Sequence, residues 1–430
     1  MDGAARPAES TAPAAARQAA TFGDVLAVRE FRALLLAQLL SIAGDQLARV
    51  AMTVLVYDRT RSALWTAVTY AVTFLPWVVG GLALAGLADR LPRREVMVGC
   101  DLIRLLLVCL MVLVSQVVPG RTALWLMVAI LFVVTLLDSP FKSARSAMVP
   151  DILQGELYVL GIAVSQTIFQ VGMVAGFALG GLVVAVLHVR VALLADAATF
   201  AASAVLVRFC VRRRPAAARP AASGPSGRAG IGAALRLVFG NRTLRTLILF
   251  GWLVAFYVVP QSLAVPYATR FHGLSVPAAA GLIFAAGPFG TMLGSIAFSR
   301  VVPSARRRIW MGPLAIASCG LLLLCLLQPG LAASLVIFTA SGACASYQLA
   351  ANAEFVAAVP TERRGQAFGL ANGGMQVTQG LWFVAAGAVA AARIAGPATA
   401  IAASGGLGVL LAAALAASWR RQPKTSPVRR

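Results

Sequence analysis

The stretch that decides the fold class is residues 96–140, VMVGCDLIRLLLVCLMVLVSQVVPGRTALWLMVAILFVVTLLDSP. It contains two apolar runs, 96–118 and 122–140, separated by a Pro-Gly-Arg sequence that ends at Arg121. About 20 apolar residues are what an α-helix needs to cross the ~30 Å hydrocarbon core of a bilayer. Neither run alternates apolar and polar residues as a membrane β-strand does. The stretch therefore predicts two consecutive membrane-spanning helices.

The rest of the chain repeats this pattern. Of its 430 residues, 60% are hydrophobic and 12% are charged, whereas soluble domains average about 25% charged residues. This composition excludes a soluble globular protein and predicts an all-α polytopic membrane protein with twelve transmembrane helices. The predicted spans are 31–57, 63–88, 96–118, 122–140, 158–187, 191–211, 243–267, 277–300, 309–328, 331–350, 366–391 and 396–418.

The placement of the cations predicts the orientation. The chain has 37 Lys and Arg against 15 Asp and Glu, and cytoplasmic loops of membrane proteins are enriched in Lys and Arg. With the N-terminus inside, 29 of the cations are cytoplasmic. We therefore expect a multi-pass protein of the cell membrane with both termini in the cytoplasm. The basicity is a topology signal and an attraction to lipid headgroups, so we expect no nucleic-acid partner.

Polar breaks divide the chain. Residues 1–30 have no apolar core and predict a disordered cytoplasmic tail. Residues 31–211 and 243–418 predict two six-helix bundles, and 419–430 a basic cytoplasmic tail. Residues 212–242 predict a cytoplasmic linker. The end of this linker has apolar residues at helical spacing, which predicts an amphipathic helix on the inner leaflet: Ile231, Ala234, Leu235, Val238 and Phe239.

An internal repeat supports this division. A shift of 210 residues places Asp89-Arg90 on Ser299-Arg300, Val149-Pro150 on Val359-Pro360, and Gln166 on Gln376. Two duplicated, pseudo-symmetric halves are the architecture of many secondary transporters. The acidic residues do not repeat, so we expect any coupling chemistry mainly in the first half.

The loop after the second predicted span carries the best local motif. It reads Ala-Gly-Leu-Ala-Asp-Arg-Leu-Pro-Arg-Arg over residues 85–94. It resembles the loop motif of the major facilitator superfamily, Gly-x-x-x-Asp-Arg-x-Gly-Arg-Arg, with Ala85 and Pro92 in place of two glycines. The resemblance implies the major facilitator fold and a transport function.

Further residues resemble the branch of this superfamily that holds macrolide-efflux and enterobactin-exporter proteins. They are Gly44-Asp45, Tyr57-Asp58, Asp101-Leu102-Ile103-Arg104, Asp138-Ser139-Pro140, Val149-Pro150-Asp151 and Pro360-Thr361-Glu362-Arg363-Arg364-Gly365. This resemblance covers roughly residues 25 to 420. It implies fold and transport more firmly than any substrate.

Two charges in the first span are the proton-coupling candidates. Asp45 lies near the predicted midplane, and Arg49 follows four residues later on the same helical face. A charge at mid-bilayer costs about 2.5–3.5 kcal/mol on insertion scales, so a partner or a function must offset that cost. Changing hydration could move Asp45 between its protonated and charged forms. The alternative is a permanent ion pair between the two residues.

The resemblance also implies a charge relay at a cytoplasmic gate, in which Asp138 closes span four near Arg90, Arg93 and Arg94. The alternative is loop capping and positive-inside anchoring. Asp101 and Arg104 are expected to pair or to support this gate. The superfamily's membrane-embedded Arg of span four is missing, and Arg49 or Arg104 could substitute for it. The full set of gate candidates is Asp89, Arg90, Arg93, Arg94, Asp101, Arg104 and Asp138.

Span five contains glycines at Gly172, Gly176, Gly180 and Gly181. The spacing is similar to the second half of the superfamily's antiporter motif, with Phe177 where that motif has Pro, which implies an exporter hinge. Close packing of helices through small residues is the alternative. For Asp196, near the expected outer end of span six, we predict an outer-gate or structural role.

Polar and aromatic residues in the spans are candidates for a central cavity. Gln166 and Gln170, and likewise Asn372 and Gln376, are four residues apart on spans five and eleven, which commonly line the cavity in this superfamily. An apolar cavity with a few polar groups suits an amphipathic organic substrate. The candidates are Gln46, Gln166, Gln170, Tyr257, Gln261, Asn372, Gln376 and Trp382.

These features favour a secondary active transporter: a proton-coupled antiporter that exports a hydrophobic or amphipathic small molecule, such as an antibiotic, drug or secondary metabolite. A siderophore exporter, or an importer or uniporter on the same fold, stays open. The sequence has no phosphate-binding Gly-x-x-x-x-Gly-Lys motif, no His-Glu-x-x-His and no Cys-x-x-Cys. We therefore expect no enzyme activity, catalytic residues, cofactor or metal, and a monomer whose partners are the substrate, protons and the lipid bilayer.

Overall fold

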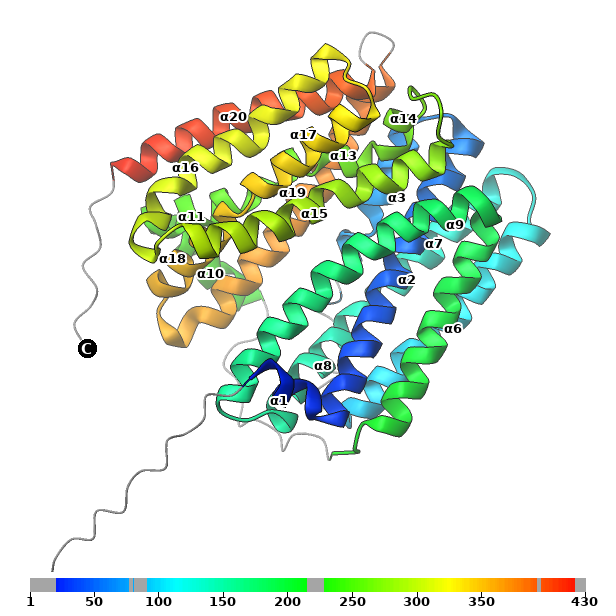
Figure 1. The fold of residues 1–430 in the computed structure, drawn as a ribbon, viewed down its shortest axis with the longest axis horizontal. Helices are drawn as coiled ribbons and strands as arrows, with labels where there is room; N and C mark the ends of the chain where they lie inside the picture. Colours follow the sequence, from blue (N-terminus) through cyan, green and yellow to red (C-terminus); the bar gives the residue numbers. More distant parts are fainter. Residues whose placement is uncertain (1–20, 77–79, 81–90, 215–227, 393–395, 422–430) are drawn as a thin grey trace, which may run out of the picture.

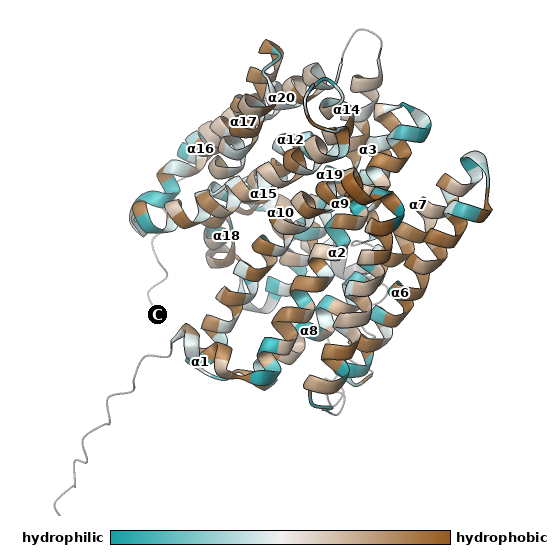
Figure 2. Ribbon diagram, turned by 45° about the vertical axis from the view of Figure 1, so that its right-hand side comes forward, coloured by the Kyte–Doolittle hydropathy of each residue, from teal (hydrophilic) through white to brown (hydrophobic). Residues whose placement is uncertain are grey.

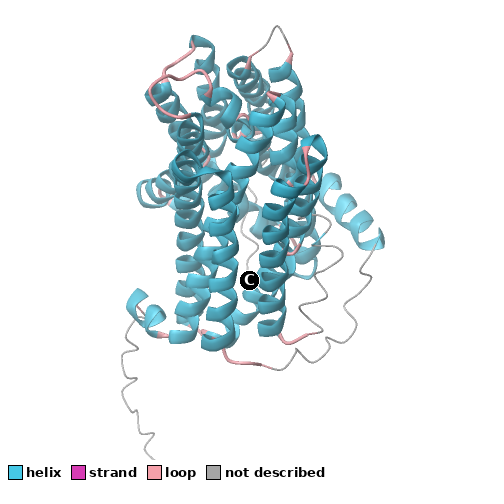
Figure 3. Ribbon diagram, turned by 90° about the vertical axis from the view of Figure 1, so that its right-hand side faces the viewer, coloured by secondary structure: helices cyan, strands magenta, loops and turns pink. Residues whose placement is uncertain are grey.

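The computed structural model describes residues 21–76, 80, 91–214, 228–392 and 396–421. Within these ranges the chain consists of helices and connecting turns, without strands (Figures 1 and 3). Two bundles of helices, one from each half of the chain, lie side by side in Figure 1. The loop motif at residues 85–94 lies largely outside the described residues.

The first half begins with a short helix that packs on the following elements. Thr21 and Asp24 cap it reciprocally: the Thr21 hydroxyl accepts from the Asp24 backbone N–H at 3.3 Å, and the Asp24 carboxylate accepts from the Thr21 N–H at 2.8 Å. The helices are α1 (Phe22–Ala27), α2 (Arg29–Thr60), α3 (Ala63–Val72), α6 (Arg93–Val117), α7 (Gly120–Leu136), α8 (Asp138–Ile152) and α9 (Glu156–Cys210).

The second half follows the linker. Its elements are α10 (Arg228–Gly240), α11 (Arg242–Trp252), α12 (Val254–Tyr257), α13 (Val259–Ser262), α14 (Ala264–Ala268), α15 (Val276–Val301), α16 (Ser304–Gly320), η1 (Leu321–Leu327), α17 (Leu331–Cys344), α18 (Tyr347–Ala358), η2 (Thr361–Arg363), α19 (Arg364–Ala391) and α20 (Pro397–Arg420).

Nine helical segments of the described chain are long and apolar enough to cross a membrane. One of them, α9, contains two expected spans, because its 55 residues change direction at His188, which has a φ of 67°. The expected breaks near Arg121 and between Gln328 and Leu331 are present as well. Brown, apolar residues occur along most of the helices in Figure 2, and many large apolar side chains are exposed, as lipid contact requires. The chain is an all-α polytopic membrane protein.

Span four differs from the prediction. We expected it to end at residue 140, but α7 and α8 continue as one apolar segment from Gly120 to Ile152. Only a short irregularity at Leu137 separates the two helices. Asp138 therefore lies in the middle part of a long span and is buried, at 3% exposure, rather than at the cytoplasmic end of span four. This shift changes its neighbours, as described below.

Span seven is broken into α11, α12, α13 and α14. Pro260 and Pro266 lie within this stretch, and proline lacks the N–H that would continue the helical ladder. The breaks re-orient the chain where it passes the centre of the molecule. Tyr257 and Gln261 are thereby placed beside the interface with the first half.

The linker is anchored at both described ends. The Glu30 carboxylate accepts from the Arg212 backbone N–H at 3.0 Å and pairs with the Arg214 guanidinium. The hydrogen bond to Glu30 raises the pKa of the Arg214 side chain above its usual value. At the other end, Ala234 and Val238 of α10 are buried against the protein, and α10 packs against α11 and α19.

The two halves touch most closely at one end of the bundle. Here α9 packs against α15, and α3 packs against α19. A Cβ on Gly181 would lie 2.6 Å from the Gly281 Cα, and one on Gly387 would approach the Ala67 side chain. Because glycine removes that Cβ, the backbones of the two halves can meet. We call this the closed end. Toward α8 and α18 the ribbons of the two halves diverge (Figure 1).

Candidate functional site

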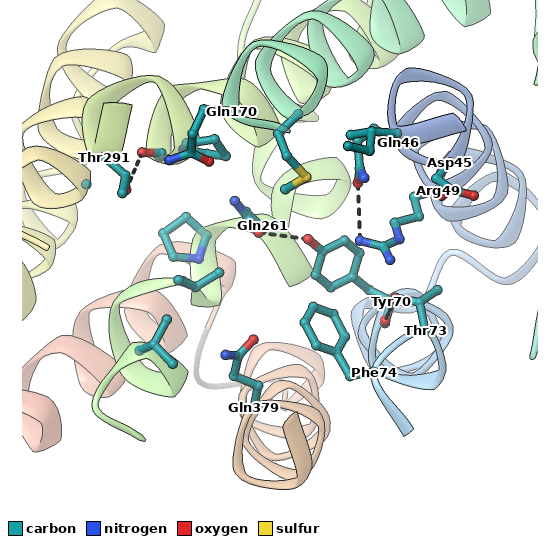
Figure 4. Close-up of a pocket in the computed structure, with 18 of the residues that line it drawn as sticks. Asp45, Gln46, Arg49, Tyr70, Thr73, Phe74, Gln170, Gln261, Thr291 and Gln379 are labelled. Carbon is teal, nitrogen blue, oxygen red and sulfur yellow. Dashed lines mark hydrogen bonds between the residues drawn. The ribbon is translucent and has the colours of Figure 1, made fainter. Parts of the chain in front are cut away.

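A cavity of about 360 Å³ lies between the halves, beyond the closed end. Helices α2, α3, α8 and α9 supply one wall, and α12, α13, α15, α17 and α19 supply the other (Figure 4). Its volume lies within the ~300–1,000 Å³ range of small-molecule sites. The lining combines aliphatic, aromatic, amide and charged side chains, which is the composition of a site for an amphipathic organic molecule.

The charged groups of this cavity all come from the first half. They are Asp45 and Arg49 of α2 and Asp138 and Lys142 of α8. The second half contributes uncharged polar groups, among them Tyr257 and Gln261. This asymmetry follows from the sequence, in which the acidic residues of the first half are not repeated in the second.

Asp45 forms an ion pair with Arg104 of α6. The Arg104 Nη2 donates to Asp45 Oδ1 at 2.5 Å, and its Nη1 donates to Ser41 Oγ at 3.2 Å. The Arg104 side chain is fully buried and lies over the Phe200 ring, with 4.1 Å from Cζ to the ring centroid. Asp45 itself is 17% exposed. The pair thus joins the cavity wall to the interior of the first bundle.

The alternative of an Asp45–Arg49 ion pair is wrong in this conformation. Arg49 donates instead to the Gln46 side chain at 3.2 Å, and its guanidinium lies 5.8 Å from the Phe74 ring centroid. Figure 4 shows Arg49 turned toward Tyr70 and Phe74. Because Arg49 lines the cavity without a carboxylate partner among the described residues, it is available to a ligand.

Asp138 pairs with neither Arg93 nor Arg94, the two expected gate arginines that the structure describes. Lys142 pairs with it at 2.6 Å, one helical turn along α8, and both residues line the cavity. Arg93 bonds to Asp151 at 2.5 Å and to the Ala147 carbonyl at 2.7 Å. The grouping of Asp138 with Arg93 is therefore wrong, because span four extends beyond residue 140. Asp89 and Arg90 lie outside the described residues.

The other gate candidates occupy two separate places. Arg94 donates to the neighbouring Glu95 at 3.0 Å, near the start of α6. Asp101 is fully buried, accepts from Ser203 at 2.6 Å and lies 3.9 Å from Arg104. Asp101 and Arg104 thus belong to the interior network around Asp45. Asp101 and Arg104 are close enough to form the expected ion pair, although their 3.9 Å separation is longer than the 2.5 Å between Arg104 and Asp45.

An aromatic cluster separates the cavity from the closed end. The Tyr70 hydroxyl of α3 donates to Gln261 Oε1 of α13 at 2.7 Å, across the two halves. The Tyr70 ring also lies 5.4–5.6 Å from the rings of Phe74, Phe284 and Phe383. We call these four residues the aromatic plug. The hydrogen bond and the ring contacts to Phe284 and Phe383 join the two halves beside the closed end.

Five of the eight cavity candidates line the cavity: Gln46, Gln170, Tyr257, Gln261 and Gln376. Gln166 and Asn372 do not; they are exposed one helical turn nearer the starts of α9 and α19. Their exposure indicates that the cavity opens in that direction. Trp382 lies behind the wall, donating to Ser404 at 3.2 Å and packing on Phe256.

The prediction missed four cavity residues. They are Tyr70 of α3, Thr73 and Phe74 directly after α3, and Lys142 of α8. Tyr70 and Thr73 are polar groups within an apolar span, a signal that was available. Lys142 was missed because span four was ended two residues too early to include it.

The span-five glycines are packing positions in this conformation. A Cβ on Gly176 would lie 2.7 Å from the Ala43 carbonyl oxygen, and one on Gly180 would lie 3.0 Å from the Leu47 Cα. Gly172 faces Ile42 in the same way. Three glycines thus bring α9 against α2, and Gly181 brings it against α15. This is the small-residue packing that the sequence allowed as an alternative to a hinge.

The architecture and the site define a membrane transporter with a central cavity between two helical bundles. Residues 34–339 match the model of the Major Facilitator Superfamily. The chain belongs to this superfamily, a family of transporters rather than enzymes.

Two similar proteins share about a quarter of their residues with this chain over the aligned regions. The chain is 27% identical over 293 residues to the multidrug efflux pump Tap of Mycobacterium tuberculosis, covering 67% of this chain and 69% of that protein. It is 27% identical over 263 residues to the MFS-type transporter YkuC of Bacillus subtilis, covering 59% of both.

Solved structures share the fold. A bacterial homologue of the human lysosomal transporter Spinster, inward-facing and unoccupied, aligns with a TM-score of 0.68 at 18% identity, covering 91% of this chain and 96% of that chain. An inward-facing bacterial homologue of the iron transporter ferroportin aligns with a TM-score of 0.68 at 16% identity, covering 92% and 99%.

Proposed function

We propose that the protein is a proton-coupled antiporter that exports hydrophobic or amphipathic small molecules. The observation that carries this proposal is the placement of Asp45. Its carboxylate lines the cavity between the two halves and bonds to the fully buried Arg104. An ionisable group inside a membrane is costly and is typically retained for a function.

The proposed cycle exchanges a proton for the substrate at Asp45. When the cavity is hydrated and the substrate is absent, Asp45 is ionised and its pair with Arg104 is stabilised. When the halves close around the cavity, loss of water favours the neutral acid. Protonation weakens the ion pair, so the charge state of Asp45 and the conformation of the halves are linked. Arg49 is the second member of the coupling group, because it lines the same cavity one turn along α2.

The substrate class follows from the walls of the cavity. Phe74, Met173 and Ile283 offer apolar surface, whereas Gln170, Gln261 and Gln376 offer amide donors and acceptors. A molecule with an aromatic or aliphatic body and a few polar groups fits this lining. The multidrug efflux pumps among the relatives agree with this class and with export.

The orientation rests on the distribution of cations. We propose that the end where the cavity opens faces the cytoplasm, because the cation-rich connections lie at that end of the predicted topology. Both termini are then cytoplasmic. The closed end, with Tyr70 and Gly281, faces the outside.

Everted membrane vesicles test the proposal. We would impose a proton gradient, acid inside, and follow the uptake of ethidium, a lipophilic aromatic cation, by wild type and by Asp45→Asn. The expected result is gradient-driven accumulation by wild type, and its loss in Asp45→Asn with ethidium counterflow retained. Asp58→Asn, an exposed carboxylate at the end of α2, is the matched control and should behave as wild type.

Three outcomes would contradict the proposal. Equal gradient-driven accumulation by wild type and Asp45→Asn would remove Asp45 from coupling. Equilibration of ethidium without accumulation against a gradient would indicate a uniporter. Accumulation in the opposite direction would indicate an importer.

A further inference from the structure

A second carboxylate lies directly behind Asp45. Asp196 is on α9, eight residues after the bend at His188, and it is 1% exposed. Neither of its carboxylate oxygens has a hydrogen-bond partner among the described residues. The sequence predicted no more than an outer-gate or structural role for it, and the proposed function does not use it.

Asp196 faces the coupling group through a small space inside the first bundle. A cavity of about 10 Å³, roughly the space of one water molecule, has walls from Asp45, Arg49, Arg104, Asp138 and Asp196. Gly44 allows this approach, since a Cβ at Gly44 would collide with Asp196 Oδ1 and Thr199 Oγ1. The residue before Asp45 therefore keeps space open for Asp196.

The charged groups that surround Asp196 come from each helix packed around this space. They are Asp45 and Arg49 of α2, Arg104 of α6 with its neighbour Asp101, and Asp138 of α8 with its partner Lys142. Including Asp196, this group has four carboxylates and three cations. If every member were ionised, the group would hold one excess negative charge. Asp196 is the one carboxylate of the group that lines only the small inner space, and it has no ion pair among the described residues.

The partners of the four carboxylates show which one is neutral. Asp45 bonds to Arg104, Asp101 to Ser203, and Asp138 to Lys142. Asp196 forms no ion pair among the described residues, and the neighbouring Thr199 hydroxyl donates to its backbone carbonyl at 2.7 Å rather than to its carboxylate. An ionised carboxylate buried without a partner is far more costly than a neutral acid in the same place. The excess charge is therefore removed at the lowest cost by a proton on Asp196.

One donor of Arg104 is complementary to this site. The Arg104 Nε–H is buried and has no acceptor among the described residues, and Arg104 lines the same small space as Asp196. An unsatisfied buried donor and an unsatisfied buried acceptor thus flank one space. If Asp196 lost its proton, Arg104, one of the two cations that line this space, could neutralise it with this free N–H.

We propose that Asp196 is a second proton-binding residue that exchanges its proton with Asp45, while Arg104 pairs with whichever carboxylate is ionised. In this conformation Asp196 holds the proton and Arg104 bonds to Asp45. In the transfer step, the Asp196 O–H bond breaks, an Asp45 carboxylate oxygen accepts the proton, and Arg104 moves its hydrogen bond from Asp45 to Asp196. Atoms and charge balance, since one proton moves and no other group is consumed. The inference rests on the proposed proton-coupled function.

The transfer would give the protein a way to keep the proton away from the cavity while the substrate is bound there. Asp196 lines only the small inner space, whereas Asp45 lines both spaces. A cation such as ethidium next to ionised Asp45 would then not compete directly with the stored proton. Competition would occur only after the proton returns to Asp45.

The first test measures the proton itself in the purified full-length protein. Infrared spectra in detergent at neutral pH should contain the C=O stretch of a protonated carboxylic acid, with a shift in D₂O. This band should lose intensity in Asp196→Asn and stay unchanged in Asp58→Asn. A wild-type spectrum without any protonated carboxylic acid would overturn the proposal, and this outcome does not depend on whether a variant folds.

The second test measures coupling in proteoliposomes with ethidium as the probe. We expect Asp196→Asn to lose proton-driven accumulation and to retain counterflow, and Asp196→Glu to recover part of the accumulation. If wild type and Asp196→Asn accumulate ethidium equally and share the same infrared band, this inference fails while the proposed function stands. If ethidium follows a Na⁺ gradient and Asp196→Asn abolishes that dependence, Asp196 binds a metal cation and the inference is overturned.

These measurements separate the two proposals. Failure of the wild type to couple ethidium to any proton gradient would contradict the proposed function. The infrared band in Asp196→Asn would still report whether Asp196 holds a proton.

Discussion

Arg104 of α6 donates to Asp45 of α2 at 2.5 Å while its own side chain is entirely shielded from solvent. The same guanidinium contacts Ser41 and the Phe200 ring and lies 3.9 Å from Asp101. One cation thus neutralises carboxylates on two helices and links α2, α6 and α9. We regard it as the structural centre of the first bundle.

Removal of Arg104 should therefore destabilise the protein. Arg104→Gln leaves Asp45 and Asp101 without their cation, and breaking a buried ion pair from one side costs about 3–5 kcal/mol. We expect a lower midpoint of thermal unfolding in detergent, measured by intrinsic tryptophan fluorescence. The double variant Arg104→Gln/Asp45→Asn should lose less stability than the two single variants together, because the orphaned charge is then removed.

Arg121→Gln is the control, since Arg121 is exposed at the start of α7. Its unfolding midpoint should match wild type. Additive effects in the double variant would show that the 2.5 Å contact contributes no coupling energy.

The Tyr70–Gln261 hydrogen bond should favour the conformation in which the closed end is shut. Tyr70→Phe keeps the ring in the aromatic plug and leaves Gln261 Oε1 buried without its donor, which costs about 1–3 kcal/mol. We expect the population of molecules whose closed end is open to increase about fivefold or more. Spin labels at Arg61 and Leu274, both near that end, should report longer distances by electron paramagnetic resonance.

Tyr158→Phe provides the comparison, because Tyr158 lies near the start of α9, away from the plug. It should leave the distance distribution unchanged. An unchanged distribution in Tyr70→Phe would show that the rings alone hold the closed end.

Much of the fold was predictable because helix length in a bilayer is set by the thickness of the hydrocarbon core. Apolar runs and polar breaks predicted the nine segments of the described chain that are long and apolar enough to cross a membrane, and the bend near residue 189, where His188 has a φ of 67°. The end of span four was wrong. Its continuation, from Phe141 to Ile152, includes Lys142 and Arg145. In a sequence such cations predict a cytoplasmic loop, because the partners that stabilise them inside a span are not known.

The pairing inside the site was less predictable for a related reason. Arg49 is the nearest cation to Asp45 in the sequence, four residues away on the same helix. Arg104 is 59 residues away and reaches Asp45 from a neighbouring helix. Helical periodicity identifies neighbours on one helix, whereas contacts between helices depend on rotation and depth, which one sequence does not specify. Asp196 illustrates the same limit, since its distance from Asp45 depends on the contact of α9 with Gly44.

The backbone contact between Gly181 and Gly281 should be required for the closed end to form. In Gly281→Ala, the new Cβ would lie 2.6 Å from the Gly181 Cα and 2.9 Å from the Phe177 carbonyl oxygen. Both neighbours are backbone atoms, so the two halves must move apart. We expect faster amide hydrogen–deuterium exchange in the first turns of α15 and in α9 near residue 181.

Gly251→Ala is the matched control, because the nearest atom to its Cβ would be the Gln348 side chain at 4.0 Å. Exchange in α9 and α15 should then equal wild type. Faster exchange in both variants would mean that alanine substitution, rather than the backbone contact, loosens the bundle.

The charge of the cavity wall should set the preference for cationic or anionic substrates. Lys142 neutralises Asp138 at 2.6 Å, and both line the cavity. Lys142→Gln removes one positive charge and leaves the Asp138 carboxylate facing the cavity. Unit charges at about 4 Å interact by up to about 4 kcal/mol near a protein surface, and tenfold in affinity corresponds to about 1.4 kcal/mol. We therefore expect ethidium to bind about tenfold more tightly or better, and an anionic dye of similar size to bind more weakly. Fluorescence titration of the purified protein measures both.

The double variant Lys142→Gln/Asp138→Asn restores neutrality and should return both affinities toward wild type. If Lys142→Gln strengthens the binding of both dyes alike, the effect comes from added space rather than charge.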